Sequence, residues 1–335
     1  MAQKILIIQT AFIGDVVLAT AMLESIHQQN PAASISILVR KGNEALLNAH
    51  PFIDQVLVWD KKQNKYGHWL HLLFTIRKHQ FDAVINVQRY AATGLWTALS
   101  GAKMKIGFDK NPFAFLFTNT IPHQSVGNGL HETERNQALL SPLGIFPNAK
   151  PALYPSLQDQ KAVEGYQAQP YLCIAPASVW FTKQFPLHQW IKLLHSIPFE
   201  GPIYLLGGPG DKHLNDQILQ AVQSPNLVNM AGRLSFLASA ALQKGALLNY
   251  VNDSAPMHFA SAVNAPVAAI YCSTVPDFGY GPLSDTSFII ETEQALPCRP
   301  CGLHGKKQCP LKHFNCAETI RLEQIYQPLQ QVLHN

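Results

Sequence analysis

The chain opens on an apolar strand that runs directly into a Gly-Asp pair and then into a helical segment. Ile5–Gln9 is the apolar run, Gly14 and Asp15 follow it, and helical periodicity begins at Val16. A strand followed at once by a helix is typical of a parallel α/β sheet, and it places Asp15 near the carboxyl end of the first strand, where such sheets bind ligands. A lone glycine does not make the Gly-x-Gly-x-x-Gly fingerprint. The turn therefore supplies an acid where a dinucleotide-binding protein supplies bare backbone.

Asp15 has two interpretations on its own. It is a favoured residue at the N-cap of a helix, here the predicted helix Val16–His27. It is also a carboxylate at the ligand edge of a sheet, where it can act as a general base. The rest of the chain favours the second interpretation.

Strand-like and helix-like segments alternate through the first half of the chain, which predicts a mostly parallel sheet covered on both faces. The predicted strands are Ile5–Gln9, Ser34–Val39, Gln55–Val58, Ala83–Val87 and Lys105–Phe108. The predicted helices are Val16–His27, Gly42–Ala49, Lys65–Lys78 and Thr93–Leu99.

A proline-rich stretch interrupts this alternation at residues 147–155, so we predict a linker over 147–168 and two domains, 1–155 and 156–335. The second-half strands are predicted at Tyr171–Ala175, Pro202–Leu206, Leu227–Asn229, Ala246–Val251 and Pro266–Ile270. The helices are predicted at Leu187–His195, Lys212–Val222, Phe236–Gln243 and Ala255–Val263, with a last helix after Glu318. Two α/β halves joined in this way predict a ligand cleft between them.

Composition narrows the class of protein. Charged residues make up 14% of the chain and the net charge is +4 with His neutral, so no basic stripe for nucleic acid is expected. Mild positive charge suits an anionic small molecule or an anionic membrane surface. No apolar run reaches the roughly 20 residues of a bilayer span, and a cytoplasmic protein is expected. Cys173 and Cys272 lie in apolar runs and are expected in the core.

The first of three motifs in the second half follows a predicted strand. Ser178, Thr182 and Lys183 lie in the turn Ala175–Pro186, together with Trp180. A lysine at the carboxyl end of a strand can neutralise a phosphate, although an exposed loop lysine is the alternative. The second motif is the turn at Gly207 and Gly208, which either admits a ligand closely or only connects a strand to a helix.

The third motif joins a strand end to a helix start in the segment Asn252–His258. The free N–H groups of Ser254 and Ala255 form an anion site at the helix N-terminus. Asp253 would instead accept hydrogen bonds from sugar hydroxyls. In the alternative interpretation Asp253 or Ser254 only caps the helix, and His258 only packs.

A base in the first half with a cation, a helix terminus and a hydroxyl-binding acid in the second half suits sugar transfer from a nucleotide diphosphate. At these motifs the sequence resembles the ADP-heptose:lipopolysaccharide heptosyltransferases, glycosyltransferase family 9. The resemblance runs along nearly the whole chain. The residues that carry it are Gly14-Asp15-Val-Val-Leu-x-Thr20, Ser178-x-Trp180-x-Thr182-Lys183-x-Phe-Pro186, Gly207-Gly-Pro-Gly-Asp211, Ala231-Gly232 and Asn252-Asp253-Ser254-Ala255-Pro256-Met-His258-Phe-Ala260.

The resemblance implies a GT-B fold, an α/β architecture of two Rossmann-like doubly wound domains facing a central cleft. Residues 1–155 would bind the acceptor and 156–335 the donor, with the last helix packing back on the N-terminal domain. The reaction would be inverting and would need no metal. It would move a heptose from ADP-heptose to a lipopolysaccharide core acceptor, either lipid A–Kdo or a heptosyl group.

The resemblance also implies residue roles. Asp15 matches the family's proposed general base, Lys183 the lysine on the donor diphosphate, and Asp253 the acid at the donor sugar. The complete expected donor set is Ser178, Thr182, Lys183, Gly207, Gly208, Asp253, Ser254, Ala255 and His258. The expected acceptor contacts are Thr10, Gly14, Arg89 and His131.

Two departures from the family pattern leave alternatives open. Ala255 stands where many relatives have Gly, and Leu237 where some place an acid on the ribose. A family 9 transferase with another nucleotide sugar is therefore one alternative. A non-enzymatic nucleotide-sugar-binding Rossmann protein is another.

Four cysteines fall close together near the C-terminus, at Cys298, Cys301, Cys309 and Cys316. Their spacing suits a structural zinc site, with His304 and His313 as alternative ligands. Disulfides or reduced thiols are the other possibilities. We expect this loop to lie apart from Lys183 and Asp253.

A basic segment in the first half bears on localisation. Lysines and an arginine surround Trp69 and could press on the inner membrane in a transient, peripheral contact, although a solvated helix face explains them too. They are Lys61, Lys62, Lys65, Arg77 and Lys78.

Overall fold

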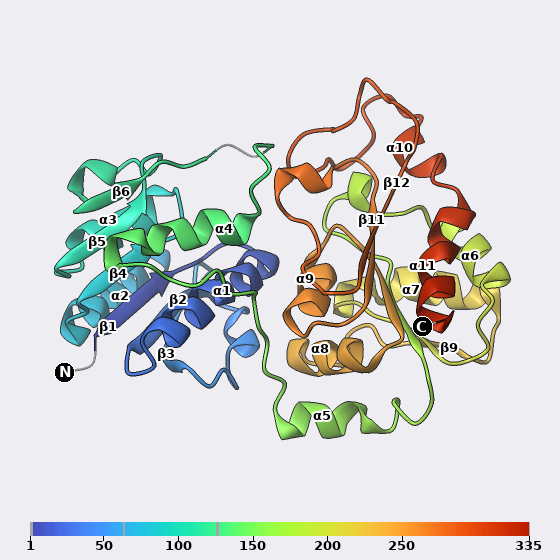
Figure 1. Ribbon diagram of the computed structural model, residues 1–335, viewed down its shortest axis with the longest axis horizontal. Coiled ribbons are helices and arrows are strands. Elements are labelled where there is room, and N and C mark those ends of the chain that lie inside the picture. The colour runs from blue at the N-terminus through green and yellow to red at the C-terminus, as the bar shows by residue number, and fades with distance from the viewer. Residues whose placement is uncertain (1–2, 63, 125–126, 335) are drawn as a thin grey trace. The chain divides into compact units, whose positions relative to one another are not determined.

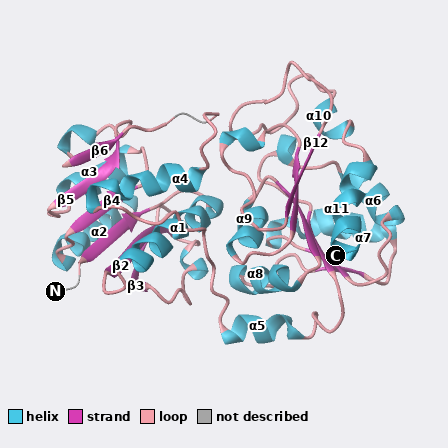
Figure 2. Cartoon of the chain, viewed as in Figure 1, coloured by secondary structure: helices cyan, strands magenta, loops and turns pink. Residues whose placement is uncertain are grey.

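The computed structural model describes residues 3–62, 64–124 and 127–334. The chain divides into an N-terminal unit, Met1–Tyr154, and a C-terminal unit, Pro155–Asn335 (Figure 1). Figure 2 shows strands enclosed by helices in each unit. Within the described part of the chain, each unit contains one six-stranded sheet in which all strand pairs are parallel, which confirms the predicted α/β class.

The N-terminal sheet has the strand order β3-β2-β1-β4-β5-β6. Its strands are β1 (Lys4–Ile8), β2 (Ser34–Arg40), β3 (Ile53–Trp59), β4 (Ala83–Asn86), β5 (Met104–Phe108) and β6 (Asn119–Ile121). The chain moves outward from β1 to β3 and then returns to the other side of β1. The order of a doubly wound sheet therefore reverses between β1 and β4, and this switch point is where such sheets bind ligands.

Helices cover the N-terminal sheet on both faces. α1 (Ile13–Gln29) packs with α4 (Glu132–Gln137), and α2 (Lys65–His79) packs with α3 (Ala91–Leu99). The predicted helix Gly42–Ala49 is wrong, because only the 3-10 turn Glu44–Leu46 forms there.

The C-terminal sheet repeats the topology in the order β12-β11-β10-β7-β8-β9. Its strands are β7 (Leu172–Ala175), β8 (Ile203–Leu205), β9 (Leu227–Asn229), β10 (Leu248–Asn252), β11 (Val267–Tyr271) and β12 (Ser287–Glu291). The switch point lies between β7 and β10. The strands carrying Lys183 and Asp253 at their ends are thus neighbours, with Val251 paired to Ala175.

The C-terminal helices are α5 (Leu157–Glu164), α6 (Leu187–Ser196), α7 (Lys212–Val222), α8 (Phe236–Gly245), α9 (Ala255–Ala262), α10 (Asn315–Glu318) and α11 (Leu322–His334). α5 forms inside the predicted linker. Ser156 caps this helix by accepting from the Asp159 N–H at 3.1 Å, just after the last proline of the linker.

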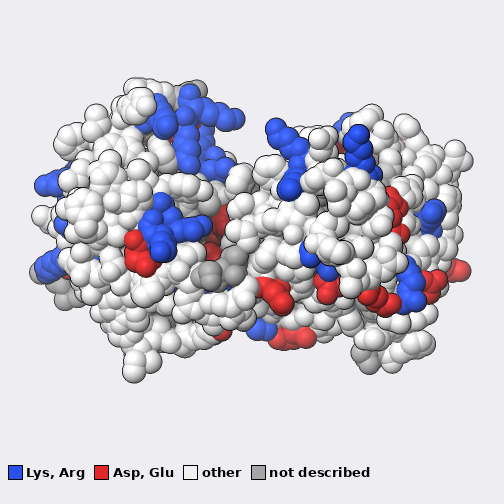
Figure 3. Space-filling model, turned by 90° about the horizontal axis from the view of Figure 1, so that it is seen from above, with Lys and Arg blue, Asp and Glu red and all other residues white. Residues whose placement is uncertain are grey.

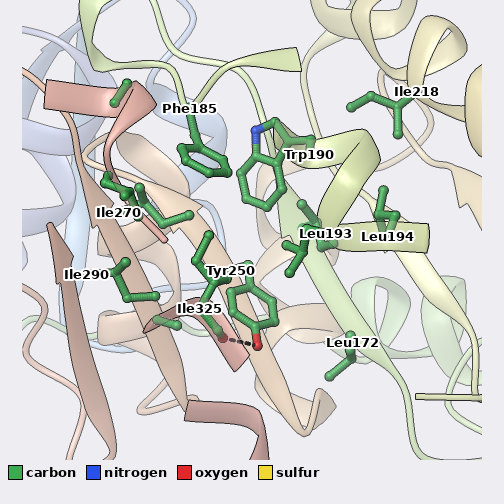
Figure 4. Packing of buried hydrophobic residues seen from close by; sticks show 14 of the residues in the cluster. Leu172, Phe185, Trp190, Leu193, Leu194, Ile218, Tyr250, Ile270, Ile290 and Ile325 are labelled. Atoms are coloured by element: carbon green, nitrogen blue, oxygen red, sulfur yellow. Dashed lines mark hydrogen bonds between the residues drawn. The ribbon is translucent and has the colours of Figure 1, made fainter. Parts of the chain in front are cut away.

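A buried core holds the C-terminal unit together. Phe185 and Trp190 meet edge to face with ring centroids 5.2 Å apart (Figure 4). Ile325 of α11 is fully buried in this core, and the Tyr250 hydroxyl donates to its carbonyl oxygen at 2.8 Å. The last helix therefore packs in the core of its own unit. Its additional packing on the N-terminal domain stays a prediction. Cys173 and Cys272 are buried as predicted.

Among the described helices and strands, the sequence did not predict five: β6, α4, α5, β12 and α10. β6 is three residues long and α4 six, too short for periodicity to register. No helix in the described ranges is long and apolar enough to cross a membrane. Lys and Arg side chains gather in clusters on the face of the N-terminal unit that Figure 3 shows.

Candidate functional site

Asp15 lies in the first turn of α1, directly after the switch-point strand β1. The helix begins at Ile13, three residues earlier than predicted, so Asp15 is its third residue and not its N-cap. The carboxylate accepts a hydrogen bond from the Phe12 backbone N–H at 3.1 Å. This bond holds the side chain over the start of the helix, at the ligand edge of the sheet.

The surroundings of Asp15 raise its pKa from 3.8 to about 6. Burial is the largest cause, because it penalises the charged form, and the negative charge of Glu132 adds to it. The N–H bonds of Phe12 and of Asp15 itself, and the charge of Arg40, act in the opposite direction. A carboxyl group with a pKa near neutrality is suited to take a proton from a hydroxyl at physiological pH.

Polar side chains extend this edge of the N-terminal sheet. Gln88, two residues beyond β4, donates through its amide to Gln9 at 2.5 Å. The Lys61 ammonium donates to the Thr10 carbonyl oxygen at 3.3 Å. The Arg40 guanidinium lies over the Phe12 ring, 4.8 Å from its centroid. The edge therefore offers two cations, Arg40 and Lys61, close to the helix that carries Asp15.

The four predicted acceptor residues have different settings. Thr10 is buried after β1, and Gly14 lies in the first turn of α1. Arg89 is exposed after β4. His131 accepts from the Thr133 N–H at 3.2 Å and so caps α4, which assigns it a structural contact.

Sequence reasoning missed Arg40 and Glu132 at this edge. Arg40 ends β2, so its position at a strand end was a usable signal. No sequence signal pointed to Glu132, because only the packing of α4 on α1 brings it near Asp15.

In the C-terminal unit the structure brings Lys183 and Asp253 together. The Lys183 ammonium lies 2.7 Å from Asp253 Oδ2, and both side chains are largely buried. The Thr274 hydroxyl, after β11, donates to the same carboxylate oxygen at 2.7 Å. Lys183 and Thr274 thus both donate to Asp253. Thr274 is a site residue that sequence reasoning missed, although it too follows a strand.

Asn252 fixes the loop that carries Lys183. Its side-chain amide donates to the Pro176 carbonyl at 2.8 Å and accepts from the Phe185 N–H at 2.9 Å. Ser178 is half-buried in this loop, where its carbonyl oxygen accepts from the Gln184 amide at 2.5 Å. The loop is thereby tied to β10 at both of its ends.

Ser254 stands at the N-cap of α9, and its side chain makes no capping hydrogen bond. Its hydroxyl instead donates to the Asn252 carbonyl at 3.3 Å. Ala255 is the first residue of the helix, and His258 is buried one turn further on. The backbone at the start of α9 thus lies beside Asp253, where an anion would benefit from the helix dipole.

The glycine turn after β8 has a structural role. A Cβ at Gly207 would lie 2.8 Å from the Asp211 Cβ, so no larger residue fits. The Gly208 N–H donates to the Asp211 carboxylate at 2.7 Å and thereby closes the 3-10 turn Pro209–Asp211. Donor contacts by these glycines stay a prediction.

The four C-terminal cysteines line one cavity of about 310 Å³, together with Thr182 and Ser273. All are free thiols. Burial is the largest cause that raises the pKa of the Cys316 thiol, to about 11, and the other three cysteines add to it. Across the described ranges, no group of three or more His, Cys, Asp or Glu side chains is arranged to hold a metal ion. Zinc therefore stays a prediction, and it would require the loop to close around the ion. His313 lines the cavity, whereas His304 is exposed.

The expectation that this loop lies apart from Lys183 is wrong. Thr182 accepts from the Lys306 N–H through its hydroxyl at 2.7 Å and donates its own N–H to the Lys306 carbonyl at 3.1 Å. A Cβ at Gly305 would lie 2.8 Å from Lys183 Cγ. The cysteine loop therefore packs against the Lys183 side chain.

Comparisons with known proteins agree with the fold described above. Residues 69–314 match the sequence model of glycosyltransferase family 9 (heptosyltransferase). Lipopolysaccharide heptosyltransferase 3 of Escherichia coli is 28% identical over 286 residues, which span 78% of this chain and 82% of the relative. The structure of E. coli ADP-heptose lps heptosyltransferase II superposes with a TM-score of 0.82 at 20% identity, covering 99% of both chains. A family 9 glycosyltransferase from Veillonella parvula superposes with a TM-score of 0.85 at 19% identity, covering 99% of this chain and 97% of that one. These neighbours share the fold of two Rossmann-like domains.

Proposed function

The chain belongs to glycosyltransferase family 9, and we propose that it is an inverting heptosyltransferase that moves a heptose from ADP-heptose to a lipopolysaccharide core acceptor. Membership of the family makes it a glycosyltransferase. The observation that carries the finer proposal is Asp15, a carboxyl group with a pKa of about 6 at the switch point of its sheet. The names of the E. coli relatives support the donor and the acceptor class.

Asp15 acts as the general base in this proposal. Its ionised carboxylate takes the proton from an acceptor hydroxyl, and the hydroxyl oxygen forms a bond to the anomeric carbon of the heptose. The bond from that carbon to the diphosphate breaks at the same time, and ADP leaves with the electron pair. Attack opposite the leaving group inverts the anomeric centre.

Lys183 and the start of α9 stabilise the departing diphosphate. A buried ammonium and free helix N–H groups supply the positive charge that a divalent ion supplies elsewhere, so we propose a metal-independent reaction. The diphosphate would compete with Asp253 for the ammonium, which now lies 2.7 Å away. Asp253 is then released toward the hydroxyls of the sugar, while Thr274 keeps it oriented.

The acceptor in this proposal carries negative charge, either as lipid A–Kdo or as a heptosyl core with phosphate. Arg40 and Lys61 support this choice, since they are the cations found beside Thr10 and Phe12 at the edge that carries Asp15. Such an acceptor is anchored in a lipid, so we place the enzyme in the cytoplasm and in peripheral contact with the inner membrane.

Leu237 favours a second candidate, a family 9 transferase with another nucleotide sugar. Its side chain is buried in α8, so this position offers no acid to the ribose of the donor. Asp159 of α5 does reach the start of α8, where it accepts from the Ser235 hydroxyl at 2.7 Å.

A panel of nucleotide sugars tests both candidates. The full chain is incubated with ADP-heptose and with UDP-, GDP- and CMP-linked sugars, with and without deacylated lipopolysaccharide core, and free nucleotide is measured. ADP release that depends on the acceptor supports the proposal. Faster release from another donor favours the second candidate. Binding without release in every combination contradicts transfer by this chain.

A further inference from the structure

Helix α2 presents two different faces, and the inner one accounts for its tryptophan. Trp69 stacks on Trp96 with ring centroids 5.7 Å apart, and its indole N–H donates to the Ala92 carbonyl at 3.0 Å. Leu72 and Ile76 lie on the same side of the helix and are buried in the core. The sequence predicts that Trp69 contacts a membrane, but Trp69 lies on the inner face of α2 and packs on Trp96.

The outer face of α2 carries an apolar stripe. Tyr66, Leu70 and Phe74 follow one another at intervals of four residues, so they lie along one side of the helix. Their exposed fractions are 78%, 49% and 68%. A helix on the surface of a globular domain normally turns polar residues to the solvent on this side. We call these three residues the α2 stripe.

Positive charge surrounds the α2 stripe. From position 61 to 79 the chain has no Asp or Glu and contains Lys61, Lys62, Lys65, Arg77 and Lys78. The Lys65 ammonium lies over the Tyr66 ring, 5.6 Å from its centroid. The Arg77 guanidinium donates to the Leu99 carbonyl at 2.9 Å, so the backbone of the half-exposed Leu99 lies beside the basic end of the helix.

We propose that the α2 stripe and its flanking cations dock on the surface of an anionic phospholipid bilayer. Exposed aromatic and aliphatic side chains enter the headgroup boundary, and lysines and arginines bind anionic headgroups around them. The absence of acidic residues from 61 to 79 argues for this occupant, because every formal charge there attracts the same surface. The inference rests on the proposed function, which supplies a lipid-anchored acceptor, and it names the face that contacts the lipid.

Vesicle co-sedimentation of the full chain tests the inference. Wild type should bind vesicles of phosphatidylcholine with phosphatidylglycerol, and bind pure phosphatidylcholine far less. Tyr66→Ser/Leu70→Ser/Phe74→Ser should lower binding at least about tenfold, because the apolar area that enters the bilayer is lost. Lys65→Gln/Lys78→Gln should lower it about fivefold for each cation removed and should flatten its salt dependence.

A matched control replaces apolar residues of similar exposure outside α2. Ile145→Ser/Leu157→Ser should bind vesicles like wild type. These side chains are 90% and 76% exposed, but Ile145 has no charged residue within four positions and Leu157 shares its helix with Asp159 and Glu164. Equal loss in this control, or wild-type binding by the triple variant, would overturn the inference. So would failure of wild type to bind anionic vesicles, whether or not sizing then shows self-association through α2.

The test separates this surface from the proposed reaction. With ADP-heptose and a deacylated, water-soluble acceptor, the α2 variants should turn over like wild type. Turnover that fails in wild type while vesicle binding persists rejects the heptosyltransferase assignment and leaves the surface in place. Normal turnover without vesicle binding rejects the surface alone.

Discussion

The Lys183 ammonium and the Asp253 carboxylate form a largely buried ion pair, 2.7 Å apart, at the switch point of the C-terminal sheet. A diphosphate that binds here takes over the ammonium. Lys183→Ala should therefore weaken ADP binding by about 1.5–3 kcal/mol, the contribution of a hydrogen bond to a charged group. Calorimetric titration with ADP measures this. Lys192→Ala, an exposed lysine on α6, should bind like wild type, and equal affinity in both variants would contradict the phosphate role of Lys183.

Asp15→Asn should reduce turnover by about 10²-fold or more, because the amide cannot take a proton from the acceptor. In wild type, turnover should fall as the pH drops through about 6, where the carboxylate becomes protonated. Glu132→Gln removes a negative neighbour, lowers the pKa of Asp15, and should move this limb to lower pH. Glu164→Gln, an exposed residue of α5, should not move it. A pH profile that is flat between 5 and 8 would return Asp15 to a purely helix-stabilising role.

Asp15→Asn should also stabilise the folded protein at neutral pH. The pKa of Asp15 is raised from 3.8 to about 6 in the folded chain, so the folded state binds its proton more tightly than the unfolded state. Stability is therefore lost as the pH rises from below 3.8 to above 6, by about 3 kcal/mol at most. Asp15→Asn should unfold at a higher temperature than wild type at pH 8, and the gap should close by pH 4. A destabilised variant at pH 8 would show that the ionised carboxylate contributes more through its Phe12 hydrogen bond than burial costs.

Gly305→Ala should weaken ADP binding, because the added methyl group would lie 2.8 Å from Lys183 Cγ and displace the side chain. Gly302→Ala is the matched control. Gly302 and Gly305 both have positive φ, 85° and 76°, so each variant carries a similar backbone strain of about 1–2 kcal/mol. Nothing lies within 4 Å of a Cβ at Gly302, so only stability should change there. If both variants bind ADP equally well, the cysteine loop does not position Lys183.

Zinc at the four cysteines predicts about one ion per chain in tag-free protein, the stoichiometry of a closed four-ligand site. Removing the ion should lower the melting temperature, because metal binding is coupled to folding of the loop. Removal should also weaken ADP binding, since Lys306 holds Thr182 next to Lys183. Cys309→Ser should lower the metal content. Metal-free protein with every thiol titratable after denaturation would reject zinc, and a smaller number of thiols would indicate disulfides.

Local sequence was sufficient for most elements of both sheets. Apolar runs such as the one at Ile5 and helical periodicities such as the one at Lys65 reflect the burial of one element against its neighbours. Consecutive residues show this burial pattern, so it can be predicted from local sequence. Local sequence failed where elements are short, as in the 3-10 turn at Glu44.

Sequence by itself placed Asp15, Lys183 and Asp253 after strands, because a polar residue that ends a buried apolar run in a parallel sheet lies at the ligand edge. Tertiary structure alone decided which strands are neighbours, and hence that Lys183 pairs with Asp253 across 70 positions. It also brought Glu132 toward Asp15 and set the pKa of that carboxyl group. These properties depend on distance and burial among residues far apart in the chain, and no local pattern records either.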